Sequence, residues 1–317
     1  MPKRGARPPG GSTRRRPAFA AAALIGSLAA CSVPVADAQD AQDTPVVLTT
    51  FTVLADMAQV VGGDDVRVES LTGPGTEIHG YEPSPDDLRR ASEADLLLAN
   101  GLGLEAWVEG LVAPLDLPTV LLTDGLDPLE IERGQSSRYP LNPHAWMSPR
   151  VGRQYVAAIA DALADLDPPQ AAAYARRAED YSSRILEVET MMVERLADLP
   201  QEHRLLVTCE GAFSYLARDT GLTEAYLWPV NAERQGTPRQ VAAVIRAVRD
   251  ADVPAVFCES TVSPLAQSQV ARETGAVLGG VLYVDSLSEP DGPVPTYLDL
   301  LRHDAEVIVA GLSGEVS

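Results

Sequence analysis

The chain has few cysteines, few aromatic residues and no hydrophobic run long enough to span a membrane. Three cysteines in 317 residues exclude a small scaffold held together by several disulfides. Aromatic side chains make up only 5% of the sequence, so the core must consist mainly of Leu, Val, Ile and Ala, as is usual for parallel sheets covered by helices. We therefore expect a globular protein of one large or two ordinary domains.

Basic residues are also scarce. The sequence has 25 Lys and Arg against 45 Asp and Glu, and its formal net charge is −20. A surface of this sign repels the phosphate backbone of nucleic acids, so we expect no nucleic-acid partner. The same surface attracts cations.

The first 30 residues have the opposite charge and a different pattern. They contain six Lys or Arg and no acid, and they end in an apolar run over residues 18–30. This run is shorter than the roughly 20 residues that a membrane-spanning helix needs, so residues 1–30 are predicted to be a signal peptide. The ending Leu28-Ala29-Ala30-Cys31 resembles the lipobox of bacterial lipoproteins, in which the cysteine is lipidated. The alternative is an ordinary signal peptide with an incidental Cys31.

Residues 31–45 are expected to be the lipidated Cys31 and a flexible tether, because they are rich in Ala, Asp and Gln without periodicity. The protein would then be exported to the cell envelope, either anchored by lipid to the outer face of the cytoplasmic membrane or periplasmic. Neither Sec nor Tat export is singled out.

The rest of the chain alternates apolar runs of strand length with longer amphipathic segments, which is the pattern of βα units around a parallel sheet. Four Ser-Pro or Thr-Pro pairs, at Ser84, Ser148, Thr237 and Ser263, predict helix starts because the hydroxyl caps free N–H groups and proline fits the first helical position. The eight expected strands are 45–52, 66–71, 95–100, 118–123, 204–209, 224–229, 254–259 and 276–283.

One long helical pattern separates the two sets of four strands. It runs over residues 167–200, with apolar positions spaced by threes and fours along one face. We expect an α/β fold of two (βα)4-type lobes with parallel sheets, an N-terminal lobe at 46–166 and a C-terminal lobe at 201–317, joined by this helix. A coiled-coil dimer seam is the less favoured alternative because both ends of the helix run directly into sheet patterns. A monomer is expected.

The four histidines divide into two pairs. His203 and His303 are expected to be exposed to solvent. His79 and His144 follow the second and fourth strands of the first lobe, at the sheet edge where ligand sites gather. In the second lobe, Glu210 follows the first strand and Asp285 follows the last. Each of these carboxylates could simply cap a helix, but the four side chains together would form a cage of two nitrogens and two oxygens for a divalent cation.

The segments around these residues resemble the metal-binding solute-binding proteins of ABC transporters, the family that captures manganese, zinc or iron outside the membrane. The stretches that carry the resemblance are 79–85 (HGYEPSP), 100–105 (NGLGLE), 142–146 (NPHAW), 210–213 (EGAF), 236–238 (GTP) and 285–287 (DSL). The resemblance implies a metal in the cleft between the lobes, held by His79, His144, Glu210 and Asp285. It also implies an ABC permease as partner and transport of the metal rather than catalysis.

Two departures from the family pattern concern neighbours of the ligands. The family usually has Asp-Pro before the first histidine, where this chain has Glu77-Ile78, and Asp-Pro-His where this chain has Asn142-Pro143-His144. Because these neighbours do not bind the metal directly, the departures affect ligand orientation rather than ligand identity.

The choice of metal depends on the third ligand. Zinc-importing members resemble one another in carrying histidine at the position of Glu210, and often a His-rich loop that residues 124–140 lack. A carboxylate oxygen favours manganese or iron over zinc. We therefore expect Mn²⁺ as the transported substrate, with Fe²⁺ second and Zn²⁺ third.

Other interpretations of the sequence remain open. Residues 101–106 match G-x-G-x-x-A, and Asp124 stands at the end of the next strand, which is a partial dinucleotide-binding fingerprint. The motif follows the third strand rather than the first, so this interpretation is remote. A metallohydrolase is disfavoured because the sequence has no H-E-x-x-H motif. A lipid-anchored adhesin would share the fold.

Cys209 and Cys258 are expected to form a disulfide. They end two strands of the same lobe, each is followed by Glu, and an exported location permits oxidation. Two buried free thiols are the alternative.

Lipidation at Cys31 is directly testable. Cells expressing the full chain and grown with labelled palmitate should incorporate label into the parent protein and not into Cys31→Ala, because the lipobox directs the lipid to the Cys31 thiol. A mature chain that begins downstream of Cys31 and carries no label would contradict the prediction.

Overall fold

The computed structural model describes residues 44–131, 140–231 and 236–315. The predicted signal peptide, Cys31 and residues 32–43 of the predicted tether lie outside the described residues. Within the three described ranges, no helix is both long and apolar enough to cross a membrane.

The first lobe is a parallel sheet with its connecting helices. The strands β1 (Val46–Thr49), β2 (Arg67–Ser70), β3 (Leu96–Ala99) and β4 (Thr119–Leu121) pair in the order β2-β1-β3-β4, and every pair is parallel. The helices that follow them are α1 (Thr52–Gly62), α2 (Pro85–Ser92), α3 (Val108–Val112) and α4 (Pro149–Leu166). Short 3₁₀ turns lie at η1 (Gly63–Asp65) and η2 (Ala145–Met147). The predicted alternation of strand and helix is confirmed here.

The second lobe repeats this order. Its strands are β5 (Leu205–Glu210), β6 (Thr223–Trp228), β7 (Ala255–Glu259) and β8 (Val277–Leu282), and its helices are α6 (Ser214–Thr220), α7 (Pro238–Ala251), α8 (Leu265–Thr274) and α9 (Tyr297–Leu312). The strands form two parallel pairs, β5-β6 and β7-β8. The predicted disulfide between Cys209 and Cys258 is present, with a Cα–Cα separation of 4.9 Å, and it joins β5 to β7. A covalent bond therefore fixes the strand that ends in Glu210.

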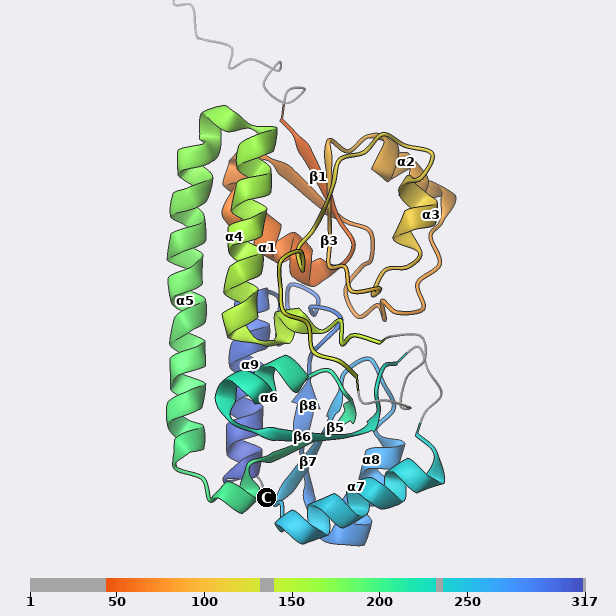
Figure 1. Ribbon diagram of the computed structural model, residues 1–317, viewed down its shortest axis with the longest axis vertical. Coiled ribbons are helices and arrows are strands. Elements are labelled where there is room, and N and C mark those ends of the chain that lie inside the picture. The colour runs from red at the N-terminus through yellow and green to blue at the C-terminus, as the bar shows by residue number, and fades with distance from the viewer. Residues whose placement is uncertain (1–43, 132–139, 232–235, 316–317) are drawn as a thin grey trace, which may run out of the picture. The chain divides into compact units, whose positions relative to one another are not determined.

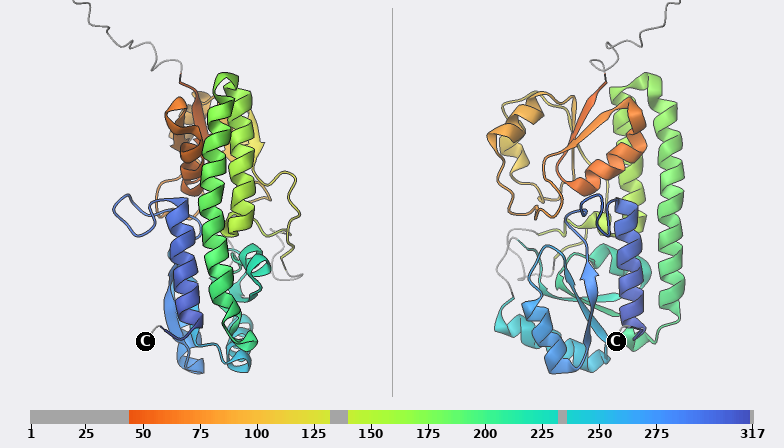
Figure 2. Two further views of the ribbon diagram at one scale, coloured as in Figure 1. Left: turned by 90° about the vertical axis from the view of Figure 1, so that its left-hand side faces the viewer. Right: turned by 180° about the vertical axis from the view of Figure 1, so that it is seen from behind.

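One long helix, α5 (Ala171–Ala197), links the lobes. It has 27 residues, about 40 Å at helical rise. It packs against α4 and α1 of the first lobe and against α9 and α6 of the second, as Figures 1 and 2 show. The predicted apolar face is confirmed, since its buried side chains are Tyr174, Ala178, Tyr181, Ile185, Val188, Met192 and Leu196. The helical turn begins as η3 (Pro168–Gln170), and the α-helix ends before η4 (Gln201–His203).

Three of the four expected Ser/Thr-Pro caps are confirmed. Ser84, Ser148 and Thr237 each accept a hydrogen bond from a backbone N–H in the first turn of α2, α4 and α7. The prediction for Ser263 was wrong. Helix α8 begins at Leu265 with Pro264 at the capping position, so the Ser263 hydroxyl lies one residue too early to cap the free N–H groups.

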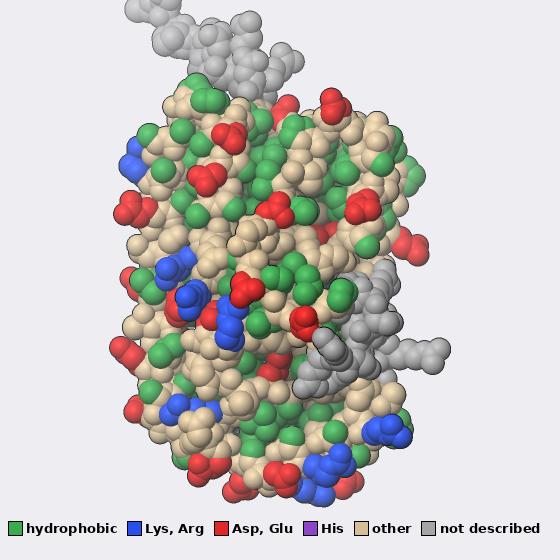
Figure 3. All heavy atoms as spheres, viewed as in Figure 1, with side chains coloured by type: hydrophobic (Ala, Val, Ile, Leu, Met, Phe, Trp, Pro, Cys, Tyr) green, Lys and Arg blue, Asp and Glu red, His purple; other side chains and the backbone are tan. Residues whose placement is uncertain are grey.

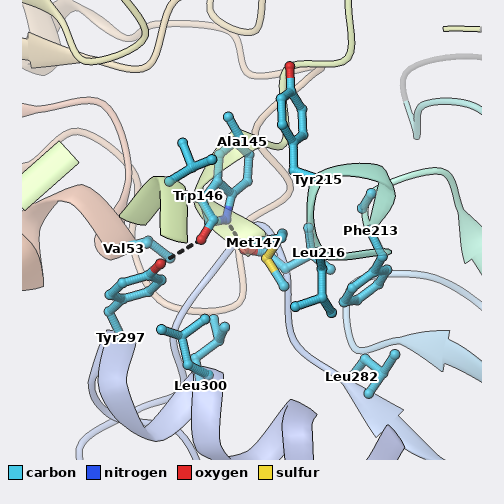
Figure 4. Close-up of a cluster of buried hydrophobic side chains, with 14 of the residues drawn as sticks. Val53, Ala145, Trp146, Met147, Phe213, Tyr215, Leu216, Leu282, Tyr297 and Leu300 are labelled. Carbon is cyan, nitrogen blue, oxygen red and sulfur yellow. Dashed lines mark hydrogen bonds between the residues drawn. The ribbon is translucent and has the colours of Figure 1, made fainter. Parts of the chain in front are cut away.

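Trp146 packs where the two lobes meet. Its indole is fully buried, and its Nε1–H donates to the Val284 carbonyl at 3.1 Å. Its own carbonyl accepts from the Tyr297 hydroxyl of α9 at 2.5 Å, and Figure 4 shows Tyr297 and Trp146 pointing toward each other. Trp146 lies two residues after His144, and Val284 lies directly before Asp285. These bonds therefore fix a predicted ligand loop of each lobe relative to the other.

Candidate metal centre

Four side chains from the two lobes meet in one buried cluster. His79 lies between β2 and α2, His144 precedes η2, Glu210 ends β5, and Asp285 follows β8. One ligand atom from each residue lies within 4.8 Å of the others, and all four residues are buried. These positions are at the carboxyl ends of strands, where parallel sheets gather their ligand sites. The structure thus brings together all four residues that the sequence singled out.

The distances in the cluster suit a single ion. The two Nε2 atoms are 3.0 Å apart, each lies 3.4 Å from Glu210 Oε1, and His79 Nε2 lies 3.9 Å from Asp285 Oδ1. Ligands bonded at about 2.1 Å to one ion lie about 3.0 Å apart at octahedral angles and about 3.4 Å apart at tetrahedral angles. The cluster therefore has the dimensions of the coordination shell of a small divalent cation.

Two carboxylate oxygens in the cluster have no hydrogen-bond partner among the described residues. They are Glu210 Oε2 and Asp285 Oδ1, and both are buried. A buried polar oxygen without a partner destabilises the fold, so such atoms need an explanation. A cation between the four side chains would satisfy both oxygens.

Asn142 sets the orientation of His144. Its Oδ1 accepts from His144 Nδ1 at 2.9 Å and from the His144 backbone N–H at 3.1 Å. The Nδ1–H tautomer leaves the Nε2 lone pair facing the cluster, as metal ligation requires. The departure to Asn at this position therefore leaves the imidazole oriented. Glu77, the other departure, accepts from the backbone N–H of His79 at 2.8 Å and of Gly80 at 3.1 Å, which holds that loop.

Asn231 is a residue of the site that the sequence analysis missed. Its backbone N–H donates to Glu210 Oε1 at 2.7 Å, and its Nδ2 donates to Asp285 Oδ2 at 3.3 Å. Its Oδ1 accepts from the Trp228 indole at 2.9 Å. Asn231 thus contacts both carboxylates of the cluster. A single Asn in the loop after β6 belongs to no motif, so the sequence offered no signal for it.

The remaining predicted site features lie elsewhere. His203 and His303 do not join the cluster, but the prediction that both are exposed was wrong, since each is half-buried. The His303 ring packs edge-on against Tyr283 at 5.3 Å and its Nε2 is 3.0 Å from the Val281 carbonyl oxygen.

In the G-x-G-x-x-A stretch, the backbone N–H groups that could bind a phosphate are already bonded to the Glu105 carboxylate of the same stretch. Buried Glu105 accepts from the backbone N–H groups of Asn100 at 2.7 Å and Gly101 at 3.1 Å, and from the Thr50 hydroxyl at 2.8 Å. A dinucleotide would need such backbone donors for its pyrophosphate. Gly101 has φ 93°, and a Cβ there would meet the Thr123 hydroxyl at 2.5 Å, which explains the glycine without a ligand.

The two carboxylates of the cluster have opposite pKa shifts. Burial opposes ionisation of Glu210, but the neighbouring imidazoles outweigh it and lower its pKa to about 2. Burial, followed by the charge of Glu210, raises the pKa of Asp285 to about 8. Asp285 therefore retains its proton near neutral pH, and a cation that binds there must displace it.

A two-lobed parallel α/β protein with imidazoles from one lobe and carboxylates from the other in a buried cluster has the architecture of a solute-binding protein with a site for a metal ion. Comparison with known proteins agrees. The family described as the periplasmic component A of a zinc-uptake complex, ZnuA, matches residues 47–311. The chain belongs to this family.

Individual relatives in this family are named for different metals. The chain is 46% identical over 301 residues to the iron-binding protein YfeA of Yersinia pestis, covering 92% of this chain and 96% of YfeA. It is 32% identical over 268 residues to the manganese-binding lipoprotein MntA of Halalkalibacterium halodurans, covering 84% and 88% of the two chains. A solved Mn-bound periplasmic metal-binding protein of Candidatus Liberibacter asiaticus is 39% identical, with a TM-score of 0.79 over 84% of this chain and 99% of that one.

The stability of the metal-free protein should depend on pH through Asp285. The folded state holds its proton up to about pH 8, whereas the unfolded state releases it near the model value of 3.8, so unfolding becomes more favourable as pH rises between these values. Between pH 6 and pH 8 the loss should be on the order of 2 kcal/mol. Glu210 adds no slope there, because its lowered pKa leaves it ionised throughout.

Thermal melting at pH 6, 7 and 8, with and without Mn²⁺, measures this effect. The stabilisation by Mn²⁺ should grow with pH as protons compete less. The matched control is Asp285→Asn, whose metal-free melting temperature should fall less over the same range, since other buried acids then supply the only slope. Parallel curves for parent and variant would show that Asp285 does not hold the proton.

Proposed function

We propose that this protein captures a divalent transition metal outside the cytoplasm through His79, His144, Glu210 and Asp285, and delivers it to an ABC permease for import. The observation that supports this most strongly is the buried convergence of two imidazoles and two carboxylates, with unpartnered oxygens, between two lobes. The relatives named as substrate-binding lipoproteins of metal ABC transporters support the permease as partner. The protein carries its metal as cargo and catalyses no reaction.

Manganese is the proposed cargo, with iron second and zinc third. Two carboxylates and two imidazoles make a ligand set that is rich in oxygen, and a carboxylate that binds through both oxygens raises the coordination number above the four that zinc prefers. The names of relatives point to iron in YfeA and manganese in MntA, so both metals fit this family. Affinity for a given site rises from manganese toward copper, so selectivity would rest on geometry and metal supply.

The proposed function assigns a role to each segment of the chain. Residues 1–30 act as the signal peptide, Cys31 carries the lipid anchor, and residues up to 45 form a tether that holds the N-terminal lobe (46–166), the linking helix (167–200) and the C-terminal lobe (201–317) near the membrane. The protein works as a monomer. Acidic side chains are spread over the face in Figure 3, which suits the attraction of cations.

The substitution Glu210→His tests the metal preference. It keeps four ligands but replaces a carboxylate by an imidazole, so Mn²⁺ should lose more affinity than Zn²⁺, and the Mn/Zn affinity ratio should fall at least tenfold. Competitive titration of both metals on the purified protein measures the ratio. His144→Ala is the control for loss of a ligand, and it should weaken both metals at least tenfold, or about 1.4 kcal/mol. An unchanged ratio in Glu210→His would contradict the assignment of Glu210.

Metal uptake in cells tests the transport function. A strain lacking this protein should take up less radioactive Mn²⁺ at low supply than the parent strain. The intact gene should restore uptake, and the His144→Ala gene, expressed to the same level, should not. Equal uptake in the parent and the deletion strain would contradict the proposal.

A further inference from the structure

Asn142 connects the loop of His144 to the second lobe. Its Nδ2 donates to the Gly211 carbonyl at 2.7 Å and to the Ser214 hydroxyl at 3.0 Å. Its backbone carbonyl accepts from the Tyr215 hydroxyl at 2.8 Å. Gly211 directly follows Glu210, so one amide side chain contacts the loops of a histidine and a carboxylate from different lobes.

The Ser214 hydroxyl in turn contacts the carboxylate of Glu224. Ser214 Oγ donates to Glu224 Oε2 at 2.5 Å, and the backbone N–H of Phe213 donates to Glu224 Oε1 at 2.9 Å. Glu224, Ser214 and Asn142 line the same cavity, which has a volume of about 370 Å³. Glu224 is not among the cluster residues. Four hydrogen-bonding groups thus form a continuous chain from Glu224 through Ser214 and Asn142 to His144.

The chemistry of these groups fixes the direction of every bond in the chain. An ionised carboxylate only accepts, so the Ser214 hydroxyl must donate its hydrogen to Glu224 and use a lone pair to accept from Asn142. The NH₂ group of Asn142 therefore faces Ser214, and its carbonyl oxygen must face His144. A carbonyl at that place requires a hydrogen on Nδ1 of His144, which leaves Nε2 free to bind a metal.

The ionisation of Glu224 is compatible with this arrangement. Burial raises its pKa to about 7, and the charge of Glu210 acts in the same direction, while the bonds from Ser214 and Phe213 oppose the shift. A measurement at pH 8 therefore examines the chain with Glu224 mainly ionised. The Gly211 carbonyl and the His144 backbone N–H support the same orientation of the Asn142 amide, so loss of Glu224 should weaken the preference for the Nδ1–H tautomer rather than invert it.

We propose that Glu224 and Ser214 are positioning residues of the second lobe that hold the metal ligand His144 of the first lobe in its binding tautomer through Asn142. This inference rests on the proposed function, because it assigns His144 as a ligand. Neither residue touches the metal. Their effect is to orient an imidazole across the junction between the lobes, so that ligand geometry depends on how the lobes meet.

The test measures Mn²⁺ affinity and the tautomer of His144 at pH 8. Ser214→Ala and Glu224→Ala should each raise the Kd about three- to tenfold, somewhat less than the loss usual for direct partners of a ligand. Nitrogen NMR shifts of the imidazole in metal-free protein should show a single Nδ1–H form in the parent and a mixture of tautomers in both variants. The conservative variants Ser214→Thr and Glu224→Gln, which keep a hydroxyl and an acceptor, should retain more of the parent affinity and tautomer.

Thr237→Ala is the matched control for stability. Thr237 caps α7 in the same lobe and, among the described residues, makes no hydrogen bond to Glu224, Ser214, Asn142 or His144. Its loss should therefore lower the melting temperature while leaving the Kd and the tautomer as in the parent. The inference is overturned if Ser214→Ala and Glu224→Ala keep the parent Kd within twofold and a single tautomer, or if Thr237→Ala changes both readouts equally. A parent protein that fails to bind Mn²⁺, Fe²⁺ and Zn²⁺ would contradict the proposed function instead. The tautomer of His144 in the metal-free protein would still test the hydrogen-bond chain from Glu224 to His144.

Discussion

The structure depends on one electrostatic constraint, namely that two carboxylates are buried together between two lobes. Glu210 and Asp285 cannot both be ionised in the empty cluster without strong repulsion, which is why their pKa values are driven apart. The buried Glu259 is subject to the same constraint, because burial and the charge of Glu210 raise its pKa well above the ordinary value, although its carboxylate accepts from the Glu210 backbone N–H. A divalent cation bound between the four side chains would relieve the repulsion and thereby stabilise the folded state.

The scaffold resists this repulsion by holding each loop with bonds that do not involve the cluster. The disulfide joins the ends of β5 and β7, and the Trp146 indole holds the chain just before Asp285. On the other side of Asp285, Ser286 accepts from the Gly75 backbone N–H at 2.7 Å, and the Leu287 N–H donates to the Thr52 hydroxyl at 2.9 Å. These bonds cross between the lobes. Helix α5 packs along both lobes and so limits the movement of one lobe relative to the other.

Much of this architecture could be predicted from the sequence, for physical reasons that differ between elements. The alternation of strands and helices in the described residues could be predicted because apolar runs bounded by turn residues are a local signal. The long helix α5 was visible because its buried face repeats every three or four residues. The first residue of α5 could be predicted only to within a few positions, because Pro168 fits both a 3₁₀ turn and the first turn of an α-helix.

The parts that the sequence did not reveal depend on contacts between distant residues. Asn231 and Glu224 belong to no sequence motif. Folding brings Asn231 to Glu210 and Glu224 to Ser214, and only these contacts reveal the two residues. The half-burial of His303 follows from its packing against Tyr283, a contact between residues that are 20 positions apart in the sequence. Ser263 resembled a helix cap because the local pattern was right, but α8 begins one residue later. The four cluster residues were found because Glu210 ends a strand, the other three lie in connections that follow strands, and all four stand in recognisable segments.

The central claim is that a single divalent cation occupies the cluster of His79, His144, Glu210 and Asp285. The most direct measurement is anomalous X-ray diffraction at the manganese edge, on crystals of the protein loaded with one equivalent of Mn²⁺. The account predicts one anomalous peak, bonded to Nε2 of both histidines and to carboxylate oxygens of Glu210 and Asp285. A peak elsewhere on the chain, with this cluster free of metal, would contradict it.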